Sequence, residues 1–152
     1  MIKRILLFLI LNFTALGIGG MFTGTGVSSD WYQNLNKAPW TPPGWMFGAA
    51  WTLIMVCFAI YMAYLIKAHL DRKKIILLFS IQWILNVAWN PLFFYSQNIL
   101  GGMICITTLT LLIAYLFFHF WKDLRIKSIF LAPYLIWLLI ATSLNAYILI
   151  FN

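Results

Sequence analysis

The polar residues within the apolar stretches of this chain are amides and hydroxyls rather than charged groups. Gln82, Asn86 and Asn90 follow one another at intervals of four residues, so on a helix they form a single stripe. Amides in hydrocarbon are costly unless they find hydrogen-bond partners, so the stripe must face other helices or a cavity. Hydrogen bonding between helices and the lining of a ligand pocket explain it equally well.

Several kinds of chemistry lack the residues that they need. The chain has no Glu, and its acids Asp30, Asp71 and Asp123 all lie outside the apolar stretches, which disfavours proton- or ion-coupled transport. No nucleophile stands near a histidine and an acid, and we expect no metal site and no resident cofactor, with His69 and His119 read as residues at span ends. The remaining indoles, amides and hydroxyls suit a flat apolar ligand with a few polar groups, such as a tetrapyrrole, a sterol or a polyaromatic drug.

Composition identifies the elements that must position these residues. Of the 152 residues, 64% are hydrophobic and 9% are charged, whereas a soluble domain carries about 25% charged residues. At about 20 residues per span, the sequence predicts an all-α membrane protein of five transmembrane helices that form one domain over residues 1–152. The spans run from about Ile5 to Phe22, Trp45 to Ile66, Ile75 to Tyr95, Ile99 to Phe120 and Ile129 to Phe151.

Basic residues at the span ends predict the orientation. Of the 10 Lys and Arg, only Lys37 lies on the side of the connection between spans 1 and 2, and the other nine share the opposite side. The positive-inside rule therefore predicts a cytoplasmic N-terminus and an external C-terminus in a bacterial plasma membrane, and it explains the net charge of +7 better than nucleic-acid binding does. The nine are Lys3, Arg4, Lys67, Arg72, Lys73, Lys74, Lys122, Arg125 and Lys127.

The connection over residues 23–44 is long for a compact protein, and such loops are commonly lids or binding loops. Ser28, Ser29 and Asp30 before Trp31 resemble a helix N-cap, and the prolines that follow should make the segment stiff. An aromatic belt at the membrane interface is the alternative. We favour a folded lid, because a belt does not need three prolines.

Aromatic and polar residues of three spans fall at similar depths. At 1.5 Å per residue, Trp51 lies about 10 Å below the outer end of its span, and Asn90 and Asn145 lie about 8 Å below theirs. The long loop is on that same side. This convergence predicts a ligand pocket in the outer half of the bundle.

Three spaced motifs resemble the TspO/translocator protein family over nearly the whole chain. They are Trp31-Tyr32-x-x-Leu35-x-Lys37-x-x-Trp40-x-Pro42-Pro43 followed by Phe47 and Trp51, Gln82-x-x-x-Asn86-x-x-Trp89-x-Pro91-x-Phe93-Phe94, and Pro133-Tyr134-x-x-Trp137-x-x-x-Ala141-Thr142-x-x-Asn145. The resemblance implies a five-helix bundle that binds porphyrins and benzodiazepine- or isoquinoline-type drugs beneath the first loop.

By this resemblance the pocket uses side chains from three spans, with a cap from the loop. Together with the stripe, the candidate ligand-binding residues are Tyr32, Trp40, Pro42, Phe47, Trp51, Gln82, Asn86, Trp89, Asn90, Trp137, Ala141, Leu144 and Asn145. The resemblance leaves open a light-dependent breakdown of porphyrin as substrate, for which Trp51 and Trp137 are the candidate catalytic residues. An indole in contact with an excited porphyrin can donate an electron.

Two departures from the family pattern indicate which kind of family member this chain resembles. Ala146 and Ile150 stand where animal members carry the Tyr and basic residue of their cholesterol motif, and Cys105 stands where an acid is common, which favours a bacterial member. The leading interpretation is a tetrapyrrole sensor or receptor in contact with membrane lipid. A porphyrin-degrading enzyme, a passive carrier and a structural protein are the alternatives.

We expect a homodimer, although the small pairs Ala15/Gly19 and Gly20/Gly24 fit self-association and internal packing equally well.

Overall fold

The computed structural model describes residues 1–68 and 71–152, and every regular element among them is a helix. The five spans are formed by α1 Ile2–Val27, α3 Gly44–Ala68, α4 Arg72–Asn90 with the π-helix η1 Pro91–Tyr95, α5 Ile99–His119, and α7 Ala132–Phe151. The short elements are α2 Asp30–Asn34, α6 Trp121–Leu124 and the 3₁₀-helix η2 Arg125–Leu131. Five segments are long and apolar enough to cross a membrane, which confirms the predicted five-helix bundle.

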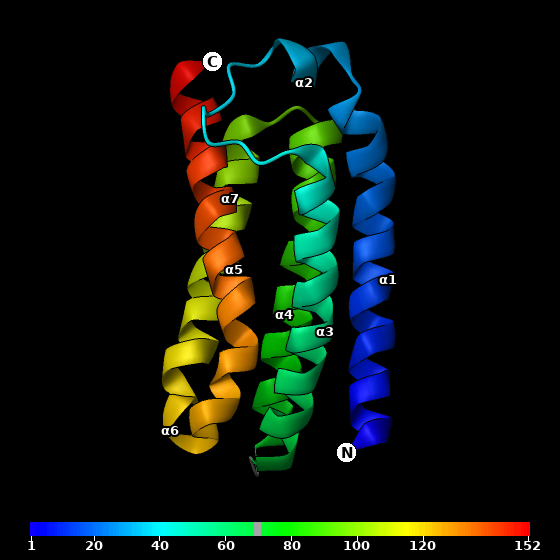
Figure 1. The fold of residues 1–152 in the computed structure, drawn as a ribbon, viewed down its shortest axis with the longest axis vertical. Helices are drawn as coiled ribbons and strands as arrows, with labels where there is room; N and C mark the ends of the chain where they lie inside the picture. The colour runs from blue at the N-terminus through cyan, green and yellow to red at the C-terminus, as the bar shows by residue number, and fades with distance from the viewer. Residues whose placement is uncertain (69–70) are drawn as a thin grey trace.

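The helices run up and down beside one another with α2 over one end (Figure 1). α1 packs against α3 and α4, α5 packs against α4 and α7, and α3 packs against α7. The order around the bundle is therefore α1, α3, α7, α5, α4. Because consecutive helices α3 and α4 touch little, the interior is shared by side chains from helices that are distant in sequence.

The first span is longer than predicted. α1 continues to Val27, so the connection covers residues 28–43 rather than 23–44. Thr23 and Thr25 hydrogen-bond back to the carbonyl oxygens of Gly19 and Met21, which lets polar residues continue the helix. Gly26 is buried against the ring of Phe94, so glycine is the residue that fits this close approach.

The third and fifth spans change helix type at one end. Pro91 has no N–H to donate, and the helix widens into η1 at this residue. The predicted start of the last span at Ile129 falls within η2, and α7 itself begins at Ala132 with Pro133 in its first turn, where proline is tolerated. Asp71 and Asn98 cap α4 and α5 by accepting from Lys74 N and Gly101 N.

Buried hydrogen bonds connect helices at several levels, both between neighbours and across the bundle. Asn12 Nδ2 of α1 donates to the carbonyl oxygen of Met55 on α3 over 3.0 Å. Tyr61 Oη of α3 donates to the carbonyl oxygen of Leu116 on α5 over 2.9 Å. Such bonds between helices help hold a bundle together where lipid cannot supply a partner.

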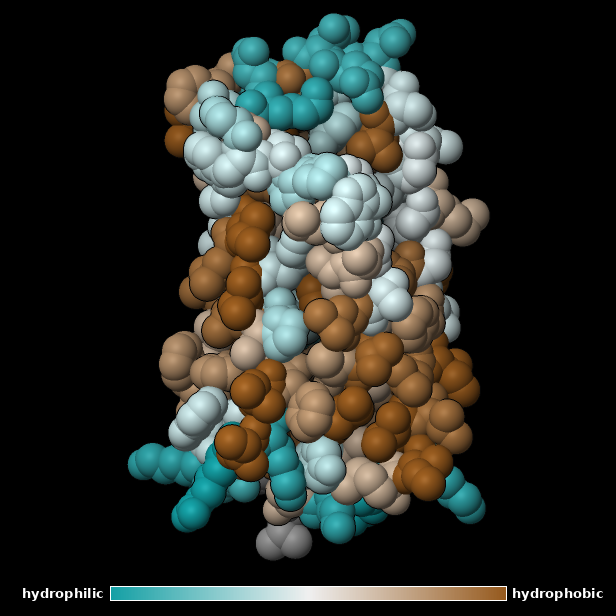
Figure 2. Space-filling view, viewed as in Figure 1, coloured by the Kyte–Doolittle hydropathy of each residue, from teal (hydrophilic) through white to brown (hydrophobic). Residues whose placement is uncertain are grey.

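The surface divides into two polar ends and an apolar flank, as the hydropathy colouring shows (Figure 2). Large side chains such as Leu53, Ile84 and Leu111 are exposed along the flank, where lipid would cover them. We call the end that carries the nine basic residues the basic end, and the end that carries residues 28–43 the loop end. His69 lies outside the described residues.

Candidate functional site

The polar stripe of α4 meets α7 inside the bundle. Gln82 Nε2 donates to Tyr134 Oη over 2.7 Å, and both side chains are almost completely buried. The other side-chain atom of this amide, Gln82 Oε1, accepts no hydrogen bond from the described residues. A buried acceptor of this kind is costly in apolar surroundings unless another group comes to it.

Aromatic rings of α3 and α7 pair directly above this contact. The Trp51 ring lies 5.8 Å from the Tyr134 ring, and the Phe47 ring lies 5.3 Å from the Trp137 ring, both edge to face. α3 and α7 run in opposite directions, so one turn along each helix brings the next pair into register. The rings fill the space between the helices, and Trp137 is only 7% exposed.

A second contact between α4 and α7 lies closer to the loop end. Trp89 Nε1 donates to Asn145 Oδ1 over 3.4 Å, and Asn145 Nδ2 donates to the carbonyl oxygen of Ala141. The Trp89 ring stacks on Phe93 with centroids 5.3 Å apart. A Cβ on Gly102 of α5 would lie 3.0 Å from the Phe93 ring, so a glycine there lets α5 approach this cluster.

The three amides of the stripe have different roles. Asn90 turns to α1, where its Oδ1 accepts from Thr23 Oγ1 over 2.6 Å, and a Cβ on Gly19 would lie 2.5 Å from its Nδ2. Asn90 therefore joins α1 to α4 and does not face α7. Asn86 is buried, and its side-chain amide makes no hydrogen bond within the described part of the chain. Of the stripe, Gln82 and Asn86 retain hydrogen-bonding capacity for a ligand.

The loop is folded, and its first half packs on the end of α4. Ser29 Oγ accepts from Tyr32 N at the start of α2. The rings of Trp31 and Tyr32 lie 5.5 and 6.4 Å from that of Phe93, and the Lys37 ammonium lies 4.9 Å from the Tyr32 ring centroid. Burial raises the pKa of the Tyr32 phenol. Tyr32 thus contacts η1, and Phe93 and Trp89 lie between it and α7.

The second half of the loop is attached to the end of α7. Trp40 Nε1 donates to Ser143 Oγ over 3.1 Å, and the Trp40 ring meets Tyr147 edge to face at 5.5 Å. Asn36 and Asn152 exchange hydrogen bonds, with Asn36 N donating to Asn152 Oδ1 over 2.8 Å. These partners are more than 100 residues apart, so no local sequence pattern predicts their contacts. Trp40 is exposed on the outside of α7, and Pro42 is half-buried.

The indole N–H groups of the candidate tryptophans differ in whether they have a hydrogen-bond acceptor. Those of Trp40 and Trp89, like that of Trp83, donate to acceptors of neighbouring helices. Those of Trp51 and Trp137 have no acceptor among the described residues. Together with Gln82 Oε1 and the Asn86 amide, they leave donors and acceptors available between α3, α4 and α7. Of the remaining candidates, Ala141 and Leu144 lie on α7, half-buried and buried respectively.

The sequence reading missed two features. It did not include Tyr134 among the ligand-binding residues, although this residue touches both Gln82 and Trp51. It also missed a cavity of about 660 Å³ at the basic end. No local pattern predicts this cavity, because its lining comes from α5, α6, η2 and α7, which meet only in the folded structure. No three His, Cys, Asp or Glu side chains gather as metal ligands within residues 1–68 and 71–152.

Comparison with known proteins agrees with this architecture. The family model described as TspO/MBR family matches residues 6–151. A tryptophan-rich protein TspO of Archaeoglobus fulgidus is 34% identical, with 94% of each chain covered. A tryptophan-rich sensory protein of Cereibacter sphaeroides is 31% identical over 90% of this chain and 87% of its own length. A translocator protein of Ovis aries is 31% identical over 88% and 84%. With this match along nearly the whole chain and five spanning helices, the protein belongs to the TspO/MBR family.

Proposed function

We propose that this protein is a membrane receptor or sensor that binds porphyrins, and benzodiazepine- or isoquinoline-type drugs, between α3, α4 and α7. The observation that carries the proposal is the set of unused polar groups among aromatic rings. The indole N–H groups of Trp51 and Trp137, Gln82 Oε1 and the Asn86 amide lack partners within the described residues. Flat ligands with a few polar groups match rings with a few polar atoms.

Binding at this site requires the rings to separate. Phe47 packs on Trp137, and Trp51 packs on Tyr134, so a porphyrin enters only when the start of α3 moves away from α7. The loop precedes α3 directly, and its Trp40 and Asn36 hold it to α7. Release of these contacts opens the site from the loop end.

The names of the relatives bear on the role of this protein. One is called a sensory protein and another a translocator protein. A sensor holds its ligand at equilibrium, whereas a passive carrier moves it from one side of the membrane to the other. A passive carrier is our alternative. Vesicles that contain the protein would then take up more porphyrin than the protein itself can bind.

A light-dependent breakdown of porphyrin is a further activity that the same site could support. Trp51 and Trp137 are candidate electron donors to an excited porphyrin held against their rings. The experiment is to mix purified protein with protoporphyrin in the dark and in light. A stable absorbance shift in the dark supports binding. Bleaching to a discrete product in light, lost in Trp51→Phe or Trp137→Phe and retained in Trp45→Phe at the exposed start of α3, supports the enzyme. No shift in the dark contradicts the proposal.

We also propose that the protein lies in a bacterial plasma membrane with its basic end in the cytoplasm. All nine basic residues outside the loop gather at one end, and the opposite end has only Lys37. A reporter that fluoresces only in the cytoplasm should then work at the N-terminus and fail at the C-terminus. The reverse result contradicts this orientation.

The expected homodimer is proposed on the outward face of α1. Ala15 and Gly19 are buried within the bundle, whereas Gly20 and Gly24 are exposed with no atom within 4 Å of a built Cβ. Small exposed residues four apart let two helices approach closely. Gly20→Leu with Gly24→Leu should shift the protein to monomer in detergent, and an unchanged mass would contradict an α1 interface.

A further inference from the structure

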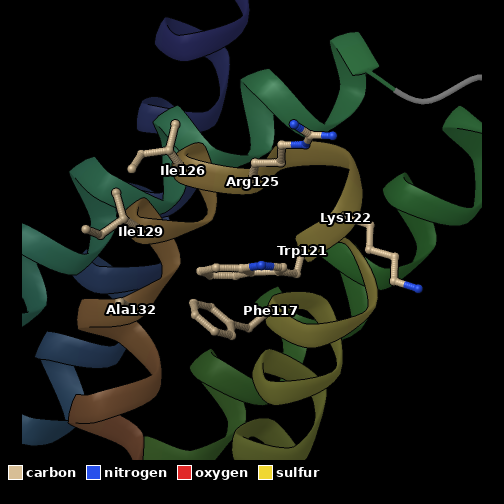
Figure 3. Close-up of a pocket in the computed structure, with 7 residues that line it drawn as sticks. All are labelled: Phe117, Trp121, Lys122, Arg125, Ile126, Ile129 and Ala132. Carbon is tan, nitrogen blue, oxygen red and sulfur yellow. The ribbon is translucent and has the colours of Figure 1, made fainter.

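The cavity at the basic end lies where the chain passes from α5 to α7. It has a volume of about 660 Å³, within the range of small-molecule sites. Figure 3 shows its lining, which comes from the end of α5, α6, η2 and the start of α7. The lining residues are Phe117, Trp121, Lys122, Arg125, Ile126, Ile129 and Ala132.

One wall of the cavity is aromatic and the other aliphatic. The Trp121 and Phe117 rings lie 5.1 Å apart, with Ile126 and Ile129 on the far side (Figure 3). Trp121 is 46% exposed, and Ile126 and Ile129 are 79% and 60% exposed. This much apolar surface is unfavourable against water, but it is well suited to a hydrocarbon chain.

Two cations belong to the rim of this cavity. Lys122 and Arg125 line it, and both are exposed to solvent. The third basic residue of the connection, Lys127, lies 4.6 Å from the Tyr64 ring centroid and so faces α3. Lys122 and Arg125 therefore lie at the rim of an apolar cavity, and their charged ends extend in different directions from it (Figure 3). Both side chains are long enough to turn toward an amphiphilic anion that enters the cavity.

The backbone at Arg125 adds a second, independent observation. Its φ is 48° and its ψ is −121°, a conformation that favours glycine. An arginine here is strained relative to glycine, so the turn is not optimised for folding alone. Strain of this kind gathers where a side chain must be placed for binding.

We propose that this cavity binds an anionic phospholipid, with its phosphate between Lys122 and Arg125 and an acyl chain along Trp121, Ile126 and Ile129. The basic end is where headgroups of the adjacent leaflet lie, and basic pockets between transmembrane helices bind anionic headgroups. A lipid reaches the cavity from the flank, because Ile126 and Ile129 are exposed there. This site is separate from the tetrapyrrole site and does not depend on it.

The test is native mass spectrometry of the full chain in detergent with phosphatidylglycerol or phosphatidylcholine. The variants are Lys122→Gln, Arg125→Gly and the control Arg72→Gln, which removes an exposed arginine from the same end but away from the cavity. We expect one tightly held phosphatidylglycerol per chain and about five-fold weaker binding in each cavity variant, because one cation near a headgroup contributes on the order of 1 kcal/mol. Arg72→Gln should bind as the unmodified protein does.

Melting temperatures and competition by glycerol phosphate distinguish lipid binding in this cavity from unfolding of the variant and from binding of a free phosphate. Arg125→Gly relieves the backbone strain, so this variant should melt at the same or a higher temperature, and its loss of lipid cannot come from unfolding. Glycerol phosphate should not displace the lipid, because it lacks the acyl chain. Equal retention of phosphatidylcholine, equal loss in Arg72→Gln, or displacement by glycerol phosphate would each overturn the proposal. Loss of protoporphyrin rather than lipid in Arg125→Gly would assign the cavity to a tetrapyrrole instead.

Discussion

Tryptophan residues occur both in the interior site between α3, α4 and α7 and at the basic end, but they pack in opposite ways. We call the interior site the loop-end site, because the loop precedes α3 directly and the site is proposed to open toward it. In the interior between α3 and α7, Trp137 is 7% exposed and its ring meets Phe47 at 5.3 Å. At the basic end, Trp121 is 46% exposed beside a cavity of about 660 Å³. The difference arises because long helices interdigitate their side chains, whereas α6 and η2 are too short to fill the corner between α5 and α7.

This contrast shows that an aromatic residue does not by itself make a pocket. The loop-end site has the more suitable polar groups but must open before a ligand enters. The basic-end cavity is already open but offers only charge and apolar surface. Binding at the loop end should therefore be slowed by rearrangement, and binding at the basic end should not.

The largest expected difference between the two ends is in folding stability. Trp137→Ala should lower the free energy of unfolding by about 3 kcal/mol, because it leaves a buried cavity between α3 and α7. Trp121→Ala should cost less than about 1 kcal/mol, because its ring is half exposed. Denaturant titration in detergent measures both values. Equal losses would mean that the basic end is as tightly packed as the loop end.

The second comparison is ligand affinity. Trp51→Ala should weaken protoporphyrin binding by about 1–3 kcal/mol, since a stacked indole and its buried area are lost. Trp121→Ala should leave protoporphyrin affinity nearly unchanged. Absorbance titration in the dark gives both dissociation constants. If Trp121→Ala has the larger effect, the porphyrin binds at the basic end and our assignment of the two sites is reversed.

A third test divides the loop-end site itself. Asn90→Ala should lower stability by about 1 kcal/mol, because it breaks the bond to Thr23 that joins α1 to α4. It should not change protoporphyrin affinity. Asn86→Ala should weaken protoporphyrin binding and leave stability nearly unchanged, because the Asn86 amide has no partner within the described residues. Melting curves measure the stability of both variants, and absorbance titrations measure their protoporphyrin affinity. If the two variants change both quantities alike, the two amides share one role.

The smallest expected effect is on ligand release. Asn36→Ala removes the hydrogen bond from Asn36 Nδ2 to the carbonyl oxygen of Phe151, which helps hold the loop to the end of α7, so the porphyrin should dissociate a few-fold faster, on the order of 1 kcal/mol. Asn34→Ala, at the exposed end of α2, is the matched control. Stopped-flow dilution measures the rates. If the release rates of both variants match that of the unmodified protein, the loop does not cover the site.

Sequence patterns predicted the spans well and their ends less well. Apolar runs of about 20 residues leave little choice other than a membrane helix, because the backbone must satisfy its own hydrogen bonds in lipid. The end of α1 was placed five residues early, since Thr23 and Gly24 look like a loop until their contacts are known. Thr23 bonds to Asn90 and Gly26 packs on Phe94, and both contacts come from a distant helix.

The sequence by itself determined the number of spans, the gathering of basic residues at one end, and the family motifs. These features depend on composition and on spacing along one chain. Only the tertiary structure decided that Asn90 faces α1 while Gln82 faces Tyr134, and that Trp40 lies outside α7 rather than among the interior rings. The physical reason is that a residue's partners depend on the order of helices around the bundle. That order comes from packing between helices far apart in sequence, so no local period encodes it.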